Sequence, residues 1–264
     1  MVEKDQQRKI EIEPLKEWRF TNLQQRVRDI YETHDVECGY GPSTILAKLL
    51  GNAATLKQVI RKTPDDFRSI DRSLTNIFIW TTTFANEADM DLGKILEKKF
   101  GSGCPHCKQM PCLLAKGEEC EKPLDWKPSS PSNNPPRSLD QWQNHLEAMY
   151  PNNFIGDLAE ILKKASGRVA DEIGELIGSS YRDIEEELRM VSFQDDIQPW
   201  ESEIADVIAW SFAVANCIRY LKGTNGNYLL GKSLKEKYKD GCPYCRSPKC
   251  ICSKAKNFIE ELKK

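Results

Sequence analysis

The second half of the chain repeats the motifs of the first half in the same order, which limits the fold to one assembled from two similar units. Two cysteine motifs, FGSGCPHCKQMPC and YKDGCPYCRSPKC, lie 138 residues apart, and a Leu-Gly-Lys segment precedes each of them at the same offset. Further upstream, Trp80 and Trp210 match at an offset of 130, as do the Ala-Asn pairs that follow them. Several matches in one order indicate a tandem duplication.

A proline-rich segment separates the two units. Residues 121–138 contain five prolines together with several Ser and Asn residues, a composition typical of an extended connector. We therefore expect one domain over 1–124, a linker over 125–137 and a second domain over 138–264.

Apolar residues recur at helical spacing in both halves, and alternating strand patterns are scarce. Residues 201–221 are apolar almost all round, which is typical of a buried central helix. Segments 43–62 and 70–87 are the expected counterparts in the first half. We predict an all-α fold of two four-helix bundles, each ending in a cysteine-rich knuckle. The bundles are expected to pack as a pseudo-dimer, because one half alone would close its core poorly.

The clustered cysteines and the lack of a secretory signal favour a reducing, cytoplasmic setting. Charged residues make up 30% of the chain and the net charge is −2, so an overall attraction to nucleic acid or to a membrane surface is not expected. The N-terminal segment has no apolar signal region, and the longest apolar stretch, 204–218, is too short to cross a bilayer.

Four acidic residues of the second half form two pairs, Glu172 with Glu175 and Glu203 with Asp206. The i, i+3 spacing puts both members of a pair on one side of a helix. The 27 residues between the pairs suffice for a turn and an antiparallel neighbour, so the four carboxylates would converge. Such a cluster repels itself unless a hard cation neutralises it, and this predicts a magnesium site.

Two structural alternatives exist for these acids. They could form a solvated helix face, although Asp206 lies in an otherwise apolar run, where a carboxylate needs a partner. They could also pair with nearby basic residues, namely Lys164, Arg168 or Arg182.

The two pairs resemble the ExxE and ExxD motifs of the all-α nucleoside triphosphate pyrophosphohydrolases, the superfamily of MazG and the dimeric dUTPases. The resemblance covers most of 140–240 and, weakly, 40–100. It implies that Glu172, Glu175, Glu203 and Asp206 bind Mg²⁺. It also implies that a metal-activated water cleaves a nucleoside triphosphate to a monophosphate and pyrophosphate.

Substrate-binding residues are expected next to this site. The family carries basic residues near the phosphates, and the matching candidates are Lys232, Lys235 and Lys237, which could instead form a solvated helix end. Trp210 follows Asp206 by one helical turn and could stack on a base, or simply pack in the core.

The first half lacks the acidic pattern. When the halves are aligned on Trp80, Ser73 and Asn76 replace Glu203 and Asp206, and the other two positions fall near Leu56 and Val59. Uncharged side chains do not assemble a comparable magnesium site. We therefore expect the first half to be a catalytically inactive partner, with one active site per chain.

Seven of the ten cysteines lie in two clusters, which favours zinc over disulfides or an iron–sulfur centre. The second cluster consists of Cys242, Cys245, Cys250 and Cys252. The first consists of Cys104, Cys107 and Cys112, with Cys120 or His106 as the fourth ligand. Both are expected to hold structural Zn²⁺, although unoccupied thiols are an alternative, whereas Cys38 and Cys217 are interpreted as isolated thiols.

These patterns leave two classes of function open. The first is a pyrophosphohydrolase whose partner is its nucleoside triphosphate substrate, acting alone or as a homodimer. The second is a non-catalytic regulator that binds nucleotides or, less in keeping with the charge balance, nucleic acid through its zinc knuckles. The intact acidic quartet favours the enzyme.

Overall fold

The computed structural model describes residues 18–120, 135–187, 199–222 and 228–252. Within these ranges all regular structure is helical and no strand occurs, which confirms the all-α prediction. The α-helices are α1 (Phe20–Glu37), α2 (Pro42–Lys62), α3 (Phe67–Glu87), α4 (Leu92–Phe100), α5 (Leu139–Met149), α6 (Leu158–Glu187), α7 (Pro199–Leu221) and α8 (Leu230–Tyr238). Two short 3-10 helices are η1 (Leu113–Lys116) and η2 (Pro151–Phe154).

Most of the expected linker lies outside the described residues, and the division into domains stays a prediction.

Short polar side chains mark several helix starts. Asp66 and Asp91 accept backbone N–H groups at the beginnings of α3 and α4, and Ser138 does the same for α5. Such N-caps satisfy donors that have no partner inside the helix.

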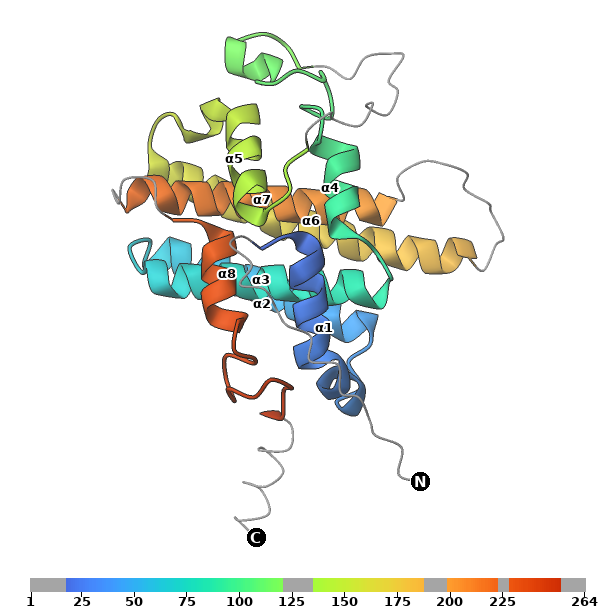
Figure 1. Ribbon diagram of the computed structural model, residues 1–264. Helices are drawn as coiled ribbons and strands as arrows, with labels where there is room; N and C mark the ends of the chain where they lie inside the picture. The colour runs from blue at the N-terminus through green and yellow to red at the C-terminus, as the bar shows by residue number, and fades with distance from the viewer. Residues whose placement is uncertain (1–17, 121–134, 188–198, 223–227, 253–264) are drawn as a thin grey trace, which may run out of the picture.

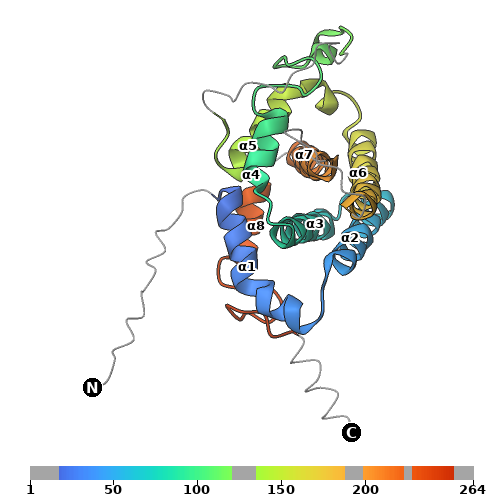
Figure 2. The same ribbon diagram turned by 90° about the vertical axis from the view of Figure 1, so that its right-hand side faces the viewer.

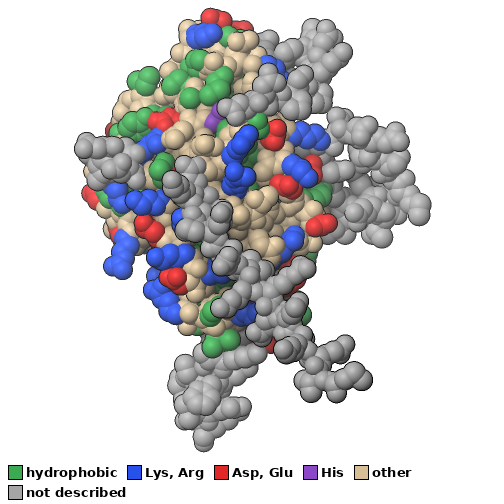
Figure 3. All heavy atoms as spheres, in the orientation of Figure 1, with side chains coloured by type: hydrophobic (Ala, Val, Ile, Leu, Met, Phe, Trp, Pro, Cys, Tyr) green, Lys and Arg blue, Asp and Glu red, His purple; other side chains and the backbone are tan. Residues whose placement is uncertain are grey.

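The four long helices α2, α3, α6 and α7 run side by side and are seen almost end-on in Figure 2. Among them, α2 packs against α3 and α6, while α7 packs against α6 and α3. The other four α-helices, α1, α4, α5 and α8, lie across one side of this group, with α5 above α8 and α4 above α1 in Figure 1 (Figures 1 and 2). On the face seen in Figure 3, Lys and Arg side chains lie among Asp and Glu side chains.

Helix α7 is the central helix of the second half. Most of its apolar residues are buried, because it contacts α3, α4, α5 and α6. By length and composition its segment Trp200–Leu221 would suffice to cross a membrane, but 67% of it is buried inside the fold. Burial against neighbouring helices accounts for its apolar composition.

The last helix of each half packs on a long helix of the other half. Helix α4 lies against α7, and α8 lies against α3. Side chains of the first half therefore reach the long helices of the second half, and the reverse also holds.

A buried glutamine fixes the first helix of the first half to the segment that begins its last helix. The side-chain amide of Gln24 donates to Oδ1 of Asn86 (3.1 Å) and to the carbonyl oxygen of Met90 (2.6 Å). Asn86 donates to the backbone oxygen of Gln24 (3.0 Å), and Oε1 of Gln24 accepts from the N–H of Leu92 (3.1 Å).

The second half contains the same network. Gln143 donates to Oδ1 of Asn216 (2.8 Å) and to the carbonyl oxygen of Tyr228 (3.3 Å). Asn216 donates to the backbone oxygen of Gln143 (3.3 Å), and Oε1 of Gln143 accepts from the N–H of Leu230 (2.9 Å). Because buried amides are costly unless they are hydrogen-bonded, each network fixes the relative positions of three segments. The Asn residues are those that the sequence aligned at an offset of 130.

Candidate functional site

The two acidic pairs face each other across α6 and α7. Glu172 and Glu175 lie on α6, Glu203 lies on α7, and one carboxylate oxygen from each falls within 4.8 Å of the others. Glu172 is only 5% exposed, Glu203 is half-buried and Glu175 is exposed. Asp206, one turn after Glu203, is close enough to raise the pKa of Glu172. The two helices that follow each other in the chain thus bring the four carboxylates into one neighbourhood, the acidic cluster.

Negative charge accumulates in this cluster. Burial, then the charges of Asp206 and Glu175, raise the pKa of Glu172 to about 7, against a small opposing effect of Arg168. The Arg168 guanidinium lies 3.6 Å from the Glu172 carboxylate, so one of the ion pairs considered from the sequence is present. Arg168 and one lysine of the first half supply two positive charges for four acids, and carboxylates held this close favour a bound cation or a proton.

A lysine from the first half enters the acidic cluster. Lys99 on α4 forms an ion pair with Asp206. Its Nζ also donates to the backbone oxygen (3.0 Å) and the hydroxyl (2.7 Å) of Ser202. Burial raises the pKa of Asp206, and Lys99 acts in the opposite direction. Sequence reasoning missed Lys99, although its match with Lys237 at the offset of 138 was a usable signal.

The lysines of α8 lie elsewhere, which corrects the expectation for Lys237. Its Nζ donates to Asp71 Oδ2 (2.6 Å) and Thr75 Oγ1 (2.8 Å), both on α3 of the first half. On the same helix Lys232 is exposed and Lys235 is half-buried. The reason is the crossed packing of the halves, because α8 lies on α3 whereas α4 lies on α7.

Trp210 lies at the edge of the acidic cluster. Its ring is half-buried, and the Arg168 guanidinium sits 5.5 Å from the ring centroid. The tryptophan ring is therefore partly packed against its neighbours and partly open to solvent. Arg168 connects it to Glu172, so an aromatic surface and a guanidinium adjoin the carboxylates.

The corresponding place in the first half carries no carboxylate cluster among the described residues. Asn76, which aligns with Asp206, donates to Oδ1 of Asn52 on α2 (3.2 Å), and Ser73 is buried. The residue facing Asn76 is thus Asn52, one turn before the expected Leu56, which is fully buried in the core.

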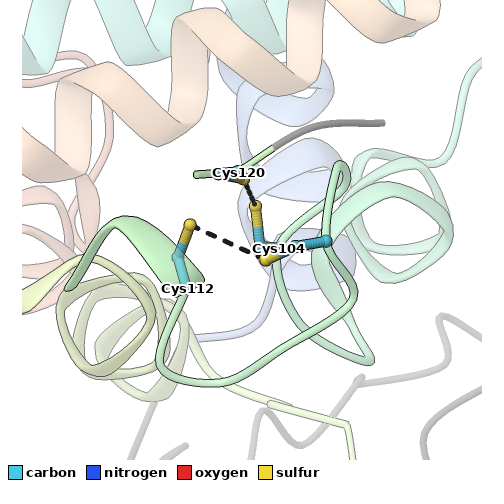
Figure 4. A group of neighbouring side chains, drawn as sticks. Cys104, Cys112 and Cys120 are labelled. Atoms are coloured by element: carbon cyan, nitrogen blue, oxygen red, sulfur yellow. Dashed lines mark hydrogen bonds between the residues drawn. The ribbon is translucent and has the colours of Figure 1, made fainter. Parts of the chain in front are cut away.

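The first cysteine knuckle (101–120) brings four thiols together. Sγ atoms of Cys104, Cys107, Cys112 and Cys120 lie within 4.8 Å of one another. Cys104 and Cys120 are 3.6 Å apart, and three of the sulfurs point towards one another in Figure 4. Cys120 is therefore the fourth member. His106 is exposed and contributes to lowering the pKa of Asp206 instead.

The second cysteine knuckle (239–252) repeats this arrangement at the opposite end of the molecule (Figure 1). Sγ atoms of Cys242, Cys245, Cys250 and Cys252 lie within 4.8 Å, and the Cys242–Cys252 distance is 3.9 Å. Tetrahedral Zn–S bonds of about 2.3 Å place ligand sulfurs roughly 3.8 Å apart. All ten cysteines are free thiols, and both clusters have the composition and spacing to bind Zn²⁺.

The two knuckles share one turn. Gly103 and Gly241 adopt φ of 131° and 128°, and a Cβ at Gly241 would lie 2.2 Å from the backbone oxygen of Ser247. Glycine is therefore required where the chain enters each cluster. Burial opposes ionisation of Cys107 and Cys245, but backbone N–H donors and neighbouring thiols lower the pKa of each to about 7. Thiolate, the form that binds metal, is thus accessible near neutral pH at these two positions, whereas burial raises the pKa of Cys112, Cys120, Cys250 and Cys252.

Each knuckle is attached to the other half of the chain. In the first knuckle, the N–H of Cys112 donates to the carbonyl oxygen of Met149 on α5 (2.9 Å). The hydroxyl of Tyr150 donates to Cys104 Sγ (3.6 Å). The first knuckle therefore rests on the second half, beside the acidic cluster.

The second knuckle contacts α1 in the same way. The N–H of Cys250 donates to the carbonyl oxygen of Ile30 (2.7 Å), and the hydroxyl of Tyr31 donates to Cys242 Sγ (3.8 Å). Outside the knuckles, Cys217 is buried in the core and Cys38 lies 3.7 Å from the His34 ring nitrogen.

Comparisons of the chain with protein-family models, with curated proteins and with solved structures find no match.

Proposed function

We propose that the protein is a magnesium-dependent nucleoside triphosphate pyrophosphohydrolase of the MazG type, which cleaves between the α- and β-phosphates. The observation that carries the proposal is the convergence of Glu172, Glu175 and Glu203 within 4.8 Å, with Asp206 alongside. These are the residues through which the two acidic motifs resemble that superfamily. Pyrophosphate release from a panel of nucleoside triphosphates with Mg²⁺ tests it.

The proposal includes a tandem-repeat, pseudo-dimeric architecture. The two glutamine networks support it, because the same four hydrogen bonds join the same elements in each half. The crossed packing of α4 on α7 and α8 on α3 is the exchange expected of a fused dimer.

The donor set fits magnesium. Carboxylate oxygens are the protein ligands that this hard cation prefers, and Glu172, Glu175 and Glu203 would hold it. When bound, the cation would neutralise phosphate charge and acidify a water molecule. Lys99 holds the Asp206 carboxylate in place, and Arg168 offers a guanidinium for phosphate oxygens.

The remaining residues orient the substrate. Trp210 presents part of its ring beside the carboxylates and suits stacking on a base. The zinc knuckles are structural in this proposal: the first holds the end of α4, and with it Lys99, against the second half. A purely regulatory protein would have no need for this quartet, which is absent from the first half.

Magnesium affinity should rise with pH. Burial and neighbouring carboxylates raise the pKa of Glu172 to about 7, so below this pH a proton occupies the carboxylate and must be displaced by the metal. One displaced proton costs about tenfold in affinity per pH unit. Calorimetric titration with Mg²⁺ should therefore give roughly tenfold weaker binding at pH 6 than at pH 8. Glu172→Gln should remove most of this difference, and equal affinity at both pH values in the unmodified protein would contradict the assignment.

Lys99 and Lys237 should differ in their effect on activity. Lys99→Ala leaves the half-buried Asp206 carboxylate without its cation, and charge-assisted hydrogen bonds are worth about 1.5–3 kcal/mol. We expect kcat/KM to fall by about tenfold or more. Lys237→Ala is the matched control, because it removes the aligned lysine and its ion pair with Asp71 without touching the acidic cluster. Equal losses from both variants would show that the effect is on stability alone.

A further inference from the structure

A cavity of about 360 Å³ occupies the place in the first half that corresponds to the acidic cluster. Side chains from α1, α2, α3 and α8 line it together with the second cysteine knuckle. Asn76 and Trp80 lie on its wall, and they align with Asp206 and Trp210 at the offset of 130. Its volume lies within the range of small-molecule sites. The first half thus has an open pocket at the place where the second half carries its carboxylates.

The wall of this cavity is rich in aromatic rings. The Tyr40 ring lies 6.0 Å from Trp80 and 5.7 Å from His34, measured between ring centroids. Tyr244 of the second knuckle completes the wall and is 59% exposed. Tyr40 is tilted by 54° to Trp80 and meets His34 edge to face at 75°, so a flat ligand would lie on the open face of one ring rather than between two, and stacking there depends little on the identity of the base.

Two cations flank these rings. The Nζ of Lys48, which lines the cavity, lies 5.7 Å from the centroid of Tyr40. The Arg72 guanidinium lies 5.8 Å from the centroid of Tyr244. Both basic side chains are exposed. Lys48 can approach an anionic group that extends from a ring lying on the pocket wall, whereas Arg72 adjoins the pocket through Tyr244 and does not line it.

Polar groups inside the cavity can form hydrogen bonds with the edge of a heterocyclic ligand. Asp35 is 5% exposed and pairs with the ring of His34 (3.0 Å), and the half-buried Asn76 bears an amide. A carboxylate, an imidazole and an amide together provide donors and acceptors for a nitrogen heterocycle. The combination differs from that of the acidic cluster, because neutral and basic groups predominate.

We propose that this cavity is a second, non-hydrolytic site that binds a nucleotide without a divalent cation. The base would lie against Tyr40 and Trp80, and the phosphate would meet Lys48. The choice of a nucleotide among flat anions rests on the proposed function, whereas the site itself rests on the cavity. Since the acidic cluster without a metal repels phosphate, nucleotide binding in magnesium-free buffer belongs to the cavity.

Calorimetric titration of the zinc-loaded, full-length protein with nucleoside monophosphates in magnesium-free buffer tests the proposal. At least one of AMP, GMP, CMP and UMP should bind. Trp80→Leu and Lys48→Glu should each weaken binding by about tenfold or more. Lys57→Glu, a charge-matched change at an exposed position of the same helix, should leave it unchanged.

Lys48 is exposed, so its replacement tests the cavity even if Trp80→Leu destabilises the fold. Absence of binding by every monophosphate, or binding equally strong in the Lys48→Glu and Lys57→Glu variants, would overturn the proposal. The proposed hydrolysis can fail separately. If the protein releases no pyrophosphate but binds a monophosphate in a Lys48-dependent manner, the cavity site stands and the enzymatic assignment falls.

Discussion

Glu203→Gln is expected to lower magnesium-dependent pyrophosphate release by at least about 100-fold, more than is typical for loss of an outer-shell partner of a metal. The amide has almost the shape of the carboxylate but carries no charge and binds a hard cation weakly. Glu203 is half-buried on α7 and is the residue through which that helix reaches Glu172 and Glu175. Initial rates of pyrophosphate release at saturating Mg²⁺ measure the effect.

Asp171→Asn is the matched control for this change. Asp171 is adjacent to Glu172 in sequence but exposed on α6, so the same loss of one negative charge should leave the rate within about twofold, as is usual for surface substitutions. If Glu203→Gln retains full activity, the acidic cluster is not the catalytic site. If the unmodified protein turns over no nucleotide, the non-catalytic binding function becomes the better explanation.

The sequence allowed the all-helical architecture to be predicted because helix periodicity is a local property. The run 201–221 is apolar on every side, and α7 indeed lies at the centre of the second half. The cysteine clusters could be predicted equally well, because ligands separated by only a few residues come together independently of the rest of the fold. Glu172 and Glu203 could be paired because α6 and α7 are consecutive helices.

Contacts between the halves could not be predicted in the same way. The i, i+3 rule says which side chains share one helix face, but it does not say which helix of the other half covers that face. Lys99 was therefore missed and Lys237 was predicted in its place, although the two lysines are aligned. The cavity beside Trp80 also escaped prediction, because it is formed by rings from α1, α3 and the second knuckle, which only packing brings together.

Loss of zinc from the first knuckle should impair the acidic cluster, although no cysteine belongs to it. Cys104→Ser replaces a thiolate ligand with a hydroxyl, which binds zinc poorly, at the position that accepts the Tyr150 hydroxyl. Loss of the metal is expected to loosen the knuckle and with it the contact of Cys112 with Met149. Lys99 lies on the helix that leads into this knuckle. We expect one zinc fewer per chain, a melting temperature lower by about 10 °C, and pyrophosphate release reduced by about tenfold or more.

Cys242→Ser makes the identical substitution in the second knuckle, and comparing the two variants separates folding from function. The second knuckle contacts Ile30 and Tyr31 of α1 and lines the cavity of the first half. Its loss should therefore cost similar thermal stability but leave more activity, when both proteins are assayed well below their melting temperatures. Each knuckle packs on the other half of the chain. Loss of zinc from one knuckle should therefore affect the site that the opposite half forms. Equal residual activity in the two serine variants, with equal zinc loss, would contradict this crossed arrangement.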